Sequence, residues 1–230
     1  MEYAHILPGI FQSRPNRFLA EVEINGIKEL CHVKNTGRCL ELLVPGAGVY
    51  VQKSERTDRK TAYDLIAVKK KELLINVDSQ VPNGVVEEWL LKEKLLENIT
   101  LLKREVRFGD SRFDLYAEYG DNQKAFLEVK GVTLENDTIA RFPDAPTQRG
   151  LKHIMELCEC RKEGYEAYLI FVIQMKGVSK LQPNWDTHKA FGDALRAADK
   201  AGVHILAYDC LVTPDTIVLD KPVEVDLGQE

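Results

Sequence analysis

The first 80 residues alternate short β-prone runs with turn residues, a pattern typical of an all-β unit. Residues 17–24 and 27–33 are two such runs, joined by Asn25-Gly26, the two-residue signal of a tight hairpin. Further strands are predicted at residues 48–53, 61–68 and 72–77. Strands this short and this closely spaced predict a small five-stranded barrel, either of the OB-fold type or of the SH3-like type.

From residue 83 the spacing of apolar positions changes to that of a helix. One helical stripe contains Val85, Val86, Trp89, Leu96 and Ile99, and Pro82-Asn83 suits its beginning. Next we expect three strands in hairpin sequence, a helix that Thr147 caps and that ends before Gly164, a central strand, another helix and a last strand. These strands and the last helix are residues 105–108, 111–118, 124–129, 168–173, 187–201 and 203–208. The order predicts an α/β domain around a mixed central sheet.

Composition is that of an ordinary globular protein, since 44% of the 230 residues are hydrophobic. No apolar run reaches the roughly 18 residues that a membrane span needs, and the N-terminus lacks the pattern of a signal peptide. The five cysteines are odd in number and include no CxxC pair, which favours a reducing compartment. We therefore expect a cytoplasmic location.

The net charge of −5 argues against binding to nucleic acid through bulk charge alone. The charge is unevenly distributed, however. Residues 1–86 contain 12 Lys and Arg against 10 Asp and Glu, whereas residues 87–230 contain 19 against 26. The first part is thus +2 and the rest −7, so a polyanion would meet the first part more favourably.

The strongest chemical pattern lies on two of the predicted strands. Because side chains alternate along a strand, Glu128 and Lys130 are expected to share one face. On the preceding strand, Asp114 is expected on one face, and Phe113 and Leu115 together on the other. Two neighbouring carboxylates repel each other unless a cation lies between them, and Mg²⁺ prefers oxygen ligands. Asp114 and Glu128 are therefore candidate metal ligands, and Lys130 can orient an attacking water, although such charges on a hairpin are often merely solvated.

The predicted helices add three candidates. On the first helix Glu88 flanks the apolar stripe and Glu87 points away from it, so Glu88 is the better candidate to reach inward. A glutamate that only covers apolar surface is the alternative. Arg149 and His153 lie on the first two turns of the helix that Thr147 caps, where they can steady a phosphate together with the helix N-terminus.

Residues that suit phosphate contacts gather at the ends of the first two predicted strands. Arginine grips phosphate oxygens with its forked donors, and asparagine adds further hydrogen bonds. The candidate nucleic-acid contacts are Arg14, Asn16, Arg17, Lys34, Asn35 and Arg38. An ordinary solvated loop is the alternative, because Asn-Thr-Gly is also a common turn sequence.

Six segments together carry a family resemblance. They are RPNRF at residues 14–18, NTGR at 35–38, ELLVPG at 41–46, SRFD at 111–114, EVKGVT at 128–133 and FPDAPTQRGLKH at 142–153. Over nearly its whole length the chain resembles the sugar fermentation stimulation protein A (SfsA) family. The resemblance implies an OB-fold domain over residues 1–82 and a PD-(D/E)XK nuclease-like domain over residues 83–230. It also implies DNA binding and a link to the regulation of sugar metabolism, particularly that of maltose.

The same resemblance assigns roles to individual residues. The family's metal-site aspartate falls on Asp114, its glutamate on Glu128 and its lysine on Lys130, which agrees with the strand pattern. The helical glutamate that many nucleases of this type possess falls on Glu88, a further candidate metal ligand. The chain departs from the family pattern at Gly131, Gly84 and Cys39, where serine, arginine and methionine are frequent. None of these departures removes a proposed ligand or the lysine.

Two hypotheses from different classes follow. The first is a nuclease that uses Mg²⁺ or Mn²⁺ to hydrolyse phosphodiester bonds of DNA, with Asp114, Glu128 and Lys130 as its catalytic residues. The second is a DNA-binding transcriptional regulator that does not cleave, against which the two carboxylates count because they would repel phosphates. A sugar sensor is a third idea that no aromatic platform supports. The sequence does not choose between DNA and RNA or between single strands and duplex, and it allows a homo-oligomer.

Overall fold

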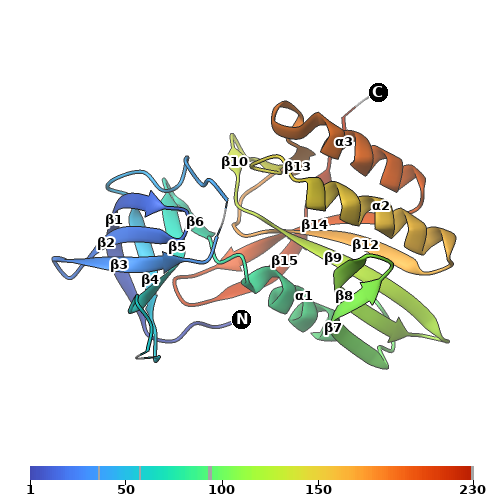
Figure 1. Ribbon diagram of the computed structural model, residues 1–230, viewed down its shortest axis with the longest axis horizontal. Helices are drawn as coiled ribbons and strands as arrows, with labels where there is room; N and C mark the ends of the chain where they lie inside the picture. The colour runs from blue at the N-terminus through green and yellow to red at the C-terminus, as the bar shows by residue number, and fades with distance from the viewer. Residues whose placement is uncertain (36, 57, 93–94, 229–230) are drawn as a thin grey trace.

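The computed structural model describes residues 1–35, 37–56, 58–92 and 95–228, which form a β-barrel followed by an α/β unit (Figure 1). The barrel strands are β1 (Ile6–Asn16), β2 (Leu19–Ile24), β3 (Ile27–Val33), β4 (Gly48–Lys53), β5 (Tyr63–Lys70) and β6 (Leu73–Asn76). Their order is β3-β2-β1-β4-β5-β6, and parallel pairing of β3 with β5 closes the first five strands into a barrel. The predicted five-stranded barrel is therefore confirmed.

The barrel is closed by β1 to β5, whereas the five predicted strands correspond to β2 to β6. The prediction therefore missed β1 and counted β6, which pairs only at the edge of β5, as a barrel strand. Pro8 and Gly9 hid β1, since both residues disfavour strands. Pro8 lies opposite Tyr50 of β4, while pairing with β2 begins only at Ile10, so the missing N–H of proline is tolerated. A Cβ at Gly9 would lie 2.6 Å from Val22 Cγ1, so glycine permits the close approach of β2.

The predicted tight hairpin joins β2 and β3. Ile24 pairs with Ile27 across the turn. Asn25 and Gly26 both have positive φ, 51° and 78°, as the favoured two-residue hairpin turn requires. Local sequence chemistry was sufficient to predict this turn.

The second unit is built on a six-stranded mixed sheet. Its strands are β7 (Leu101–Phe108), β8 (Ser111–Tyr119), β9 (Gln123–Val132), β12 (Glu166–Ile173), β14 (His204–Val212) and β15 (Ile217–Pro222). Their order is β15-β14-β12-β9-β8-β7, and β12 is parallel to both of its neighbours. A smaller sheet, which the sequence did not predict, contains β10 (Glu135–Asn136), β11 (Ile139–Phe142), β13 (Lys180–Pro183) and β16 (Glu224–Val225).

Helices cover both faces of the large sheet (Figure 1). They are α1 (Val81–Lys92), α2 (Gln148–Lys162) and α3 (Trp185–Lys200). Buried side chains of α2 and α3 belong to one hydrophobic core, whereas those of α1 belong to the core on the opposite face. Thr147 caps α2 as predicted, because its hydroxyl accepts a hydrogen bond of 3.0 Å from the amide of Gly150.

The first helix is shorter than its apolar stripe suggested. It ends at Lys92 among the described residues, and Leu96 and Ile99 lie beyond it in a non-helical segment, although Leu96 is still buried. The beginning of the chain contacts both units, since the amide of Tyr3 donates to the carbonyl of Asp215 and the Tyr3 hydroxyl accepts from Asn76 of β6. Among the described residues, no helix is long and apolar enough to span a membrane.

Candidate metal and nucleic-acid site

Four elements of the second unit bring the candidate side chains together. Asp114 comes from β8, Glu128 and Lys130 from β9, and His153 from α2. The first turn of α1 adds Asn83, which the sequence analysis treated only as part of a helix start. The predicted meeting of Asp114 with Glu128 and Lys130 is present, and all three lie just beyond the last pair of the ladder between β8 and β9.

Asp114 lies where the regular alternation of β8 breaks. Phe113 packs against Phe126 in the core beneath α2, with ring centroids 5.5 Å apart, whereas Leu115 belongs to the core beneath α1. The prediction that Phe113 and Leu115 share a face was therefore wrong. The ladder between β8 and β9 ends at Leu115, so the backbone of β9 beside Asp114 is no longer paired with β8 and the Asp114 carboxylate can accept from it. Val129 N donates to Oδ2 and Asn83 Nδ2 donates to Oδ1, each at 2.8 Å.

Glu128 is a buried carboxylate with one partnered and one unpartnered oxygen. Its side chain is 2% exposed, and its Oε1 contacts both Lys130 Nζ and His153 Nδ1. Its Oε2 is buried and has no hydrogen-bond partner among the described residues. Burial raises the pKa of this carboxyl, but the contacts from His153 and Lys130 outweigh burial and hold the pKa below its ordinary value.

The pKa of Asp114 moves in the opposite direction. Burial raises it, and repulsion from Glu128 raises it further, despite the hydrogen bonds from Val129 and Asn83. The site thus holds negative charge that the protein itself does not neutralise, next to the unpartnered oxygen of Glu128. A hard divalent cation fits both features, because carboxylate oxygens are the ligands that such cations prefer.

The donor set also restricts the kind of metal. Within the described ranges, no group of three or more His, Cys, Asp and Glu side chains is placed to hold a metal ion. Two carboxylates alone would leave most coordination positions to water and substrate phosphate, the usual situation of Mg²⁺ in phosphoryl-transfer sites. The residues present therefore fit Mg²⁺ or Mn²⁺ bound by Asp114 and Glu128.

Glu88 does not join this site. Its carboxylate lies 2.7 Å from the amino nitrogen of Met1, and the side chain is 44% exposed. Asn83 and Glu88 are five residues apart, so they point about 140° apart around the helix. Since Asn83 contacts Asp114, Glu88 faces elsewhere, and its predicted role as a metal ligand finds no support in this geometry.

Arg149 and His153 form a short chain of contacts that ends at Glu128. Arg149 Nε donates to His153 Nε2 at 3.4 Å, and the opposite ring nitrogen, Nδ1, faces the Glu128 carboxylate. This arrangement assigns a proton to Nδ1 and leaves Nε2 as the acceptor. His153 is buried and holds Glu128, whereas Arg149 is exposed and is the better placed of the two to contact a phosphate.

Two of the barrel residues predicted to contact nucleic acid, Arg14 and Lys34, instead bind other groups of the protein. Arg14 donates through Nη1 and Nη2 to four backbone carbonyls at 2.6–2.9 Å, those of Arg17, Asn35, Gly37 and Arg38. Lys34 lies between two carboxylates and is only 16% exposed. Both residues therefore hold the loops together, a long-range role that their neighbours in the sequence do not reveal.

The other barrel candidates divide into turn residues and surface cations. Asn16 Oδ1 accepts from the amide of Phe18 at 2.9 Å, and Asn35 Oδ1 accepts from that of Gly37 at 2.8 Å, so both asparagines stabilise turns. Arg17 and Arg38 are exposed. The backbone amide of Arg38 also donates to Asp144 Oδ2 at 2.9 Å, which joins its loop to the segment before α2.

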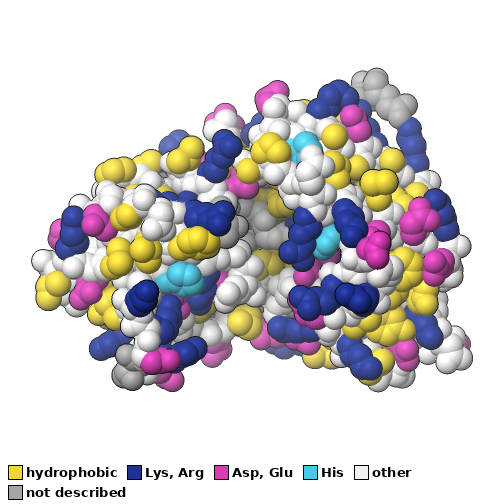
Figure 2. Space-filling view, in the orientation of Figure 1, with side chains coloured by type: hydrophobic (Ala, Val, Ile, Leu, Met, Phe, Trp, Pro, Cys, Tyr) yellow, Lys and Arg dark blue, Asp and Glu magenta, His cyan; other side chains and the backbone are white. Residues whose placement is uncertain are grey.

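The surface between the two units is hollowed. Figure 2 shows this hollow with Lys and Arg side chains on both of its walls. Each of the two units that form these walls has an exposed arginine among the candidates: Arg38 on the barrel loop and Arg149 on α2. A polyanion in the hollow would therefore meet positive charge from both sides.

Close packing explains the glycine beside the lysine of the site. A Cβ at Gly131 would lie 2.5 Å from Gln174 Oε1 and 2.9 Å from Pro82 Cγ. Three hydrogen bonds hold the Gln174 amide, so it is not free to move aside. We expect Gly131→Ala to lower the free energy of unfolding by about 1–3 kcal/mol, as measured by urea denaturation. Gly48→Ala is the control, because its Cβ would meet only the flexible Lys69 side chain; equal effects of the two substitutions would contradict this explanation.

Comparisons with known proteins agree with this architecture. Residues 13–77 match the model of the SfsA N-terminal OB domain, and residues 80–216 match that of the sugar fermentation stimulation protein RE domain. Sugar fermentation stimulation protein homologs from Clostridium beijerinckii and Ruminiclostridium cellulolyticum are each 56% identical over 227 residues, covering 99% of this chain and 100% of each relative.

A solved structure extends the comparison to three dimensions. The structure of Pyrococcus furiosus SfsA in complex with Ca²⁺ is 30% identical in sequence and has a TM-score of 0.88, and the match covers 98% of each chain. The predicted architecture is confirmed: an OB-type barrel is followed by an α/β domain with a mixed central sheet, and the second domain matches the RE domain of the family. This chain belongs to the sugar fermentation stimulation protein (SfsA) family.

Proposed function

We propose that the protein is a divalent-metal-dependent nuclease that hydrolyses phosphodiester bonds of DNA. The observation that carries this proposal is the buried, unpartnered Oε2 of Glu128 beside Asp114, whose negative charge the protein does not neutralise. The Ca²⁺ in the solved structure of Pyrococcus furiosus SfsA supports a divalent cation in this family. Cleavage of labelled DNA in the presence of Mg²⁺, and its loss in EDTA, tests the proposal.

Each side chain of the site has a distinct role in this proposal. Asp114 and Glu128 would hold Mg²⁺ or Mn²⁺, which would supply Lewis-acid chemistry for the phosphate and the attacking water. Lys130 holds its ammonium beside Glu128, where it can donate a hydrogen bond to the attacking water. Asn83 and the amide of Val129 fix the two oxygens of Asp114. These contacts keep the carboxylate in one orientation before substrate arrives.

The phosphate backbone would be held by exposed arginines of the two units. Arg149 lies in the first turn of α2, where the helix dipole also favours a phosphate. Arg38 and Arg17 lie on the barrel side. Contacts of this kind set affinity and its dependence on salt but read no base sequence.

Arg38 and Arg14 are expected to behave differently when replaced by alanine. Arg38→Ala should weaken DNA binding by about tenfold and lower the slope of log K against log salt by about one, because one phosphate contact is lost. Fluorescence anisotropy at several salt concentrations measures both quantities. Arg14→Ala should instead lower the free energy of unfolding by about 2 kcal/mol, because four carbonyls lose their donor. An unchanged affinity and salt slope for Arg38→Ala would exclude that loop from the DNA interface.

His153 is expected to stabilise the fold by a pH-dependent amount. His153→Leu should lower the free energy of unfolding near neutral pH by about 1–3 kcal/mol, because the ionised Glu128 loses a buried partner. Because the pKa of Glu128 is lowered in the folded state, the ionised carboxylate stabilises the fold at pH values above the ordinary glutamate pKa of 4.5. This stabilisation is lost as the pH falls through the folded-state pKa. The difference between wild type and variant should therefore shrink below that pH.

A surface histidine provides the control for this experiment. His204 lies 2.9 Å from Glu166, but the two side chains are 46% and 31% exposed. His204→Leu should change the free energy of unfolding by less than about 1 kcal/mol at any pH. If urea denaturation shows the same pH dependence for both variants, His153 does not stabilise Glu128 as proposed.

A further inference from the structure

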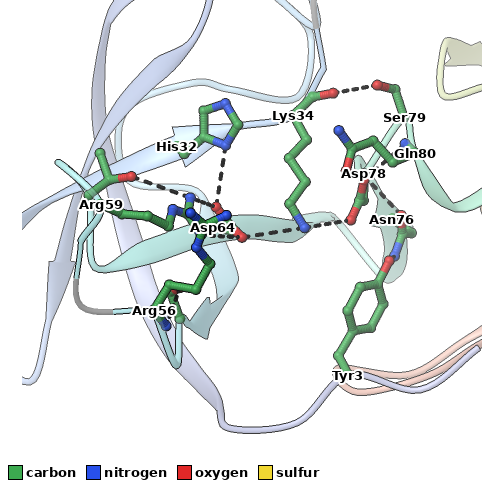
Figure 3. Close-up of polar contacts among 12 residues, drawn as sticks. Tyr3, His32, Lys34, Arg56, Arg59, Asp64, Asn76, Asp78, Ser79 and Gln80 are labelled. Carbon is green, nitrogen blue, oxygen red and sulfur yellow. Dashed lines mark hydrogen bonds and ion pairs between the residues drawn. The ribbon is translucent and has the colours of Figure 1, made fainter.

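A cluster of buried charges joins the barrel to the second unit (Figure 3). Lys34, which follows β3, places Nζ 3.1 Å from Asp78 Oδ2 and 3.4 Å from Asp64 Oδ2. The two carboxylates are 3% and 7% exposed. Asp64 has a second cation, because Arg59 Nη1 lies 3.0 Å from Oδ2. In the described part of the chain, Lys34 is the one cation that pairs with Asp78, so Asp78 depends on it.

Asp78 in turn shapes the start of α1. Its Oδ1 accepts from the amide of Gln80 at 3.0 Å, and its own amide donates to Asn76 Oδ1 at 3.0 Å. Its carbonyl oxygen accepts from the amide of Val81, the first residue of α1, at 3.4 Å. Carboxylate contacts of this kind define the turn from which a helix begins. The direction of α1 is therefore set partly by how Asp78 is held.

The same turn is fixed to the sheet on its other side. Gln174 Nε2 donates to the Asn76 carbonyl, to Asn76 Oδ1 and to the Asp78 carbonyl, at 3.0–3.1 Å. Gln174 follows β12, and its backbone amide donates to the carbonyl of Val132 at 2.9 Å. Val132 lies on β9, two residues after Lys130. Residues 76–78 are thus held between the barrel, through Lys34, and the strand that bears the site.

The first turn of α1 transmits this arrangement to Asp114. Asn83 lies five residues after Asp78 and donates to Asp114 Oδ1 at 2.8 Å. Pro82 lies against Gly131, the residue that follows Lys130. A change in the position of Asp78 would therefore move the donor that orients the Asp114 carboxylate.

We propose that Lys34 is a positioning residue through which the barrel fixes the orientation of Asp114. The inference rests on the proposed function in one respect, that Asp114 is a metal ligand. Lys34 directly precedes the loop that carries Asn35 and Arg38, so DNA contact on this loop and metal binding at Asp114 share one structural connection. Because coupling between two binding sites is reciprocal, any change that DNA on the barrel loop causes in metal affinity would equal the change that the metal causes in DNA affinity.

The first test observes the connection without any metal. The side-chain amide resonances of Asn83 in ¹⁵N-edited NMR report its hydrogen bond to Asp114, and Asp114→Ala identifies the shift that loss of this bond produces. Lys34→Met should move these resonances toward the Asp114→Ala position, and Lys34→Arg should restore them. Arg59→Met is the matched control, since it removes a partner of Asp64 and leaves the pair of Lys34 with Asp78. Unmoved resonances in Lys34→Met, or equal movement in Arg59→Met, would overturn the proposal.

The second test measures Mn²⁺ affinity by calorimetry in the same proteins. Lys34→Met should weaken Mn²⁺ binding by about tenfold, the size of effect typical of residues that orient a metal ligand. Arg59→Met should leave the affinity within about twofold. Unchanged affinity in Lys34→Met would overturn the connection to the metal site. If the wild type binds no Mn²⁺, the proposed function fails, while the NMR comparison still decides whether Lys34 orients Asp114.

Discussion

Asp114→Asn is expected to reduce metal-dependent DNA cleavage by at least about a thousandfold, or about 4 kcal/mol of activation free energy. The substitution removes one of the two carboxylates that fit the metal and keeps the size of the side chain. Single-turnover cleavage rates measure the effect, and calorimetry should show that Mn²⁺ binding is lost as well. Cleavage within about tenfold of the wild-type rate would contradict the assignment of Asp114.

This loss of activity should not be caused by unfolding. The pKa of Asp114 is raised by burial and by Glu128, so the ionised carboxyl is disfavoured in the folded state. Ionised Asp114 therefore lowers the free energy of unfolding at pH values above the ordinary aspartate pKa of 3.8. A neutral asparagine removes this unfavourable contribution. Thermal denaturation at neutral pH should therefore show no large loss of stability. Asp193→Asn, at an exposed carboxylate of α3, is the control for a neutralised aspartate that leaves cleavage unchanged.

Lys130→Met is expected to lower kcat by about a hundredfold to a thousandfold with little change in KM, because Lys130 acts on the attacking water rather than on substrate binding. Metal binding separates this variant from Asp114→Asn. Removal of the ammonium beside Glu128 takes away a positive charge that opposes a cation, so Mn²⁺ should bind at least as tightly as in the wild type. A variant that loses Mn²⁺ affinity, or that keeps the wild-type kcat, would contradict the proposed role of Lys130.

The sequence predicted correctly those turns and helix ends that depend only on neighbouring residues. Asn25-Gly26 gave the hairpin of the barrel, and Thr147 gave the start of α2. The same signals failed where tertiary packing decides. No strand was predicted before residue 17, where Pro8 disfavours one, yet β1 pairs with β4 at Pro8. Apolar Leu96 extended the predicted first helix too far, because a buried residue after the end of a helix continues its stripe by coincidence.

The site was partly predictable for the same reason. Strand alternation and the family resemblance placed Asp114 near Glu128 and Lys130, which the structure brings together. Asn83 was missed because a single asparagine at a helix start carries no signal of a partner 31 residues away. Lys34 resembled a phosphate contact in the sequence, since only the fold reveals its pairing with Asp78, 44 residues later.

The most direct test of the nuclease proposal is cleavage of labelled single-stranded and double-stranded DNA by the wild-type protein in Mg²⁺, Mn²⁺ or EDTA, with Asp114→Asn and Lys130→Met in parallel. The proposal predicts cleavage that requires the metal and that both substitutions reduce by at least about a hundredfold, and the preferred strandedness emerges from the same assay. A wild-type protein that binds DNA but never cuts it would contradict the proposal and support a DNA-binding regulator. Cleavage that survives both substitutions would contradict the site assignment.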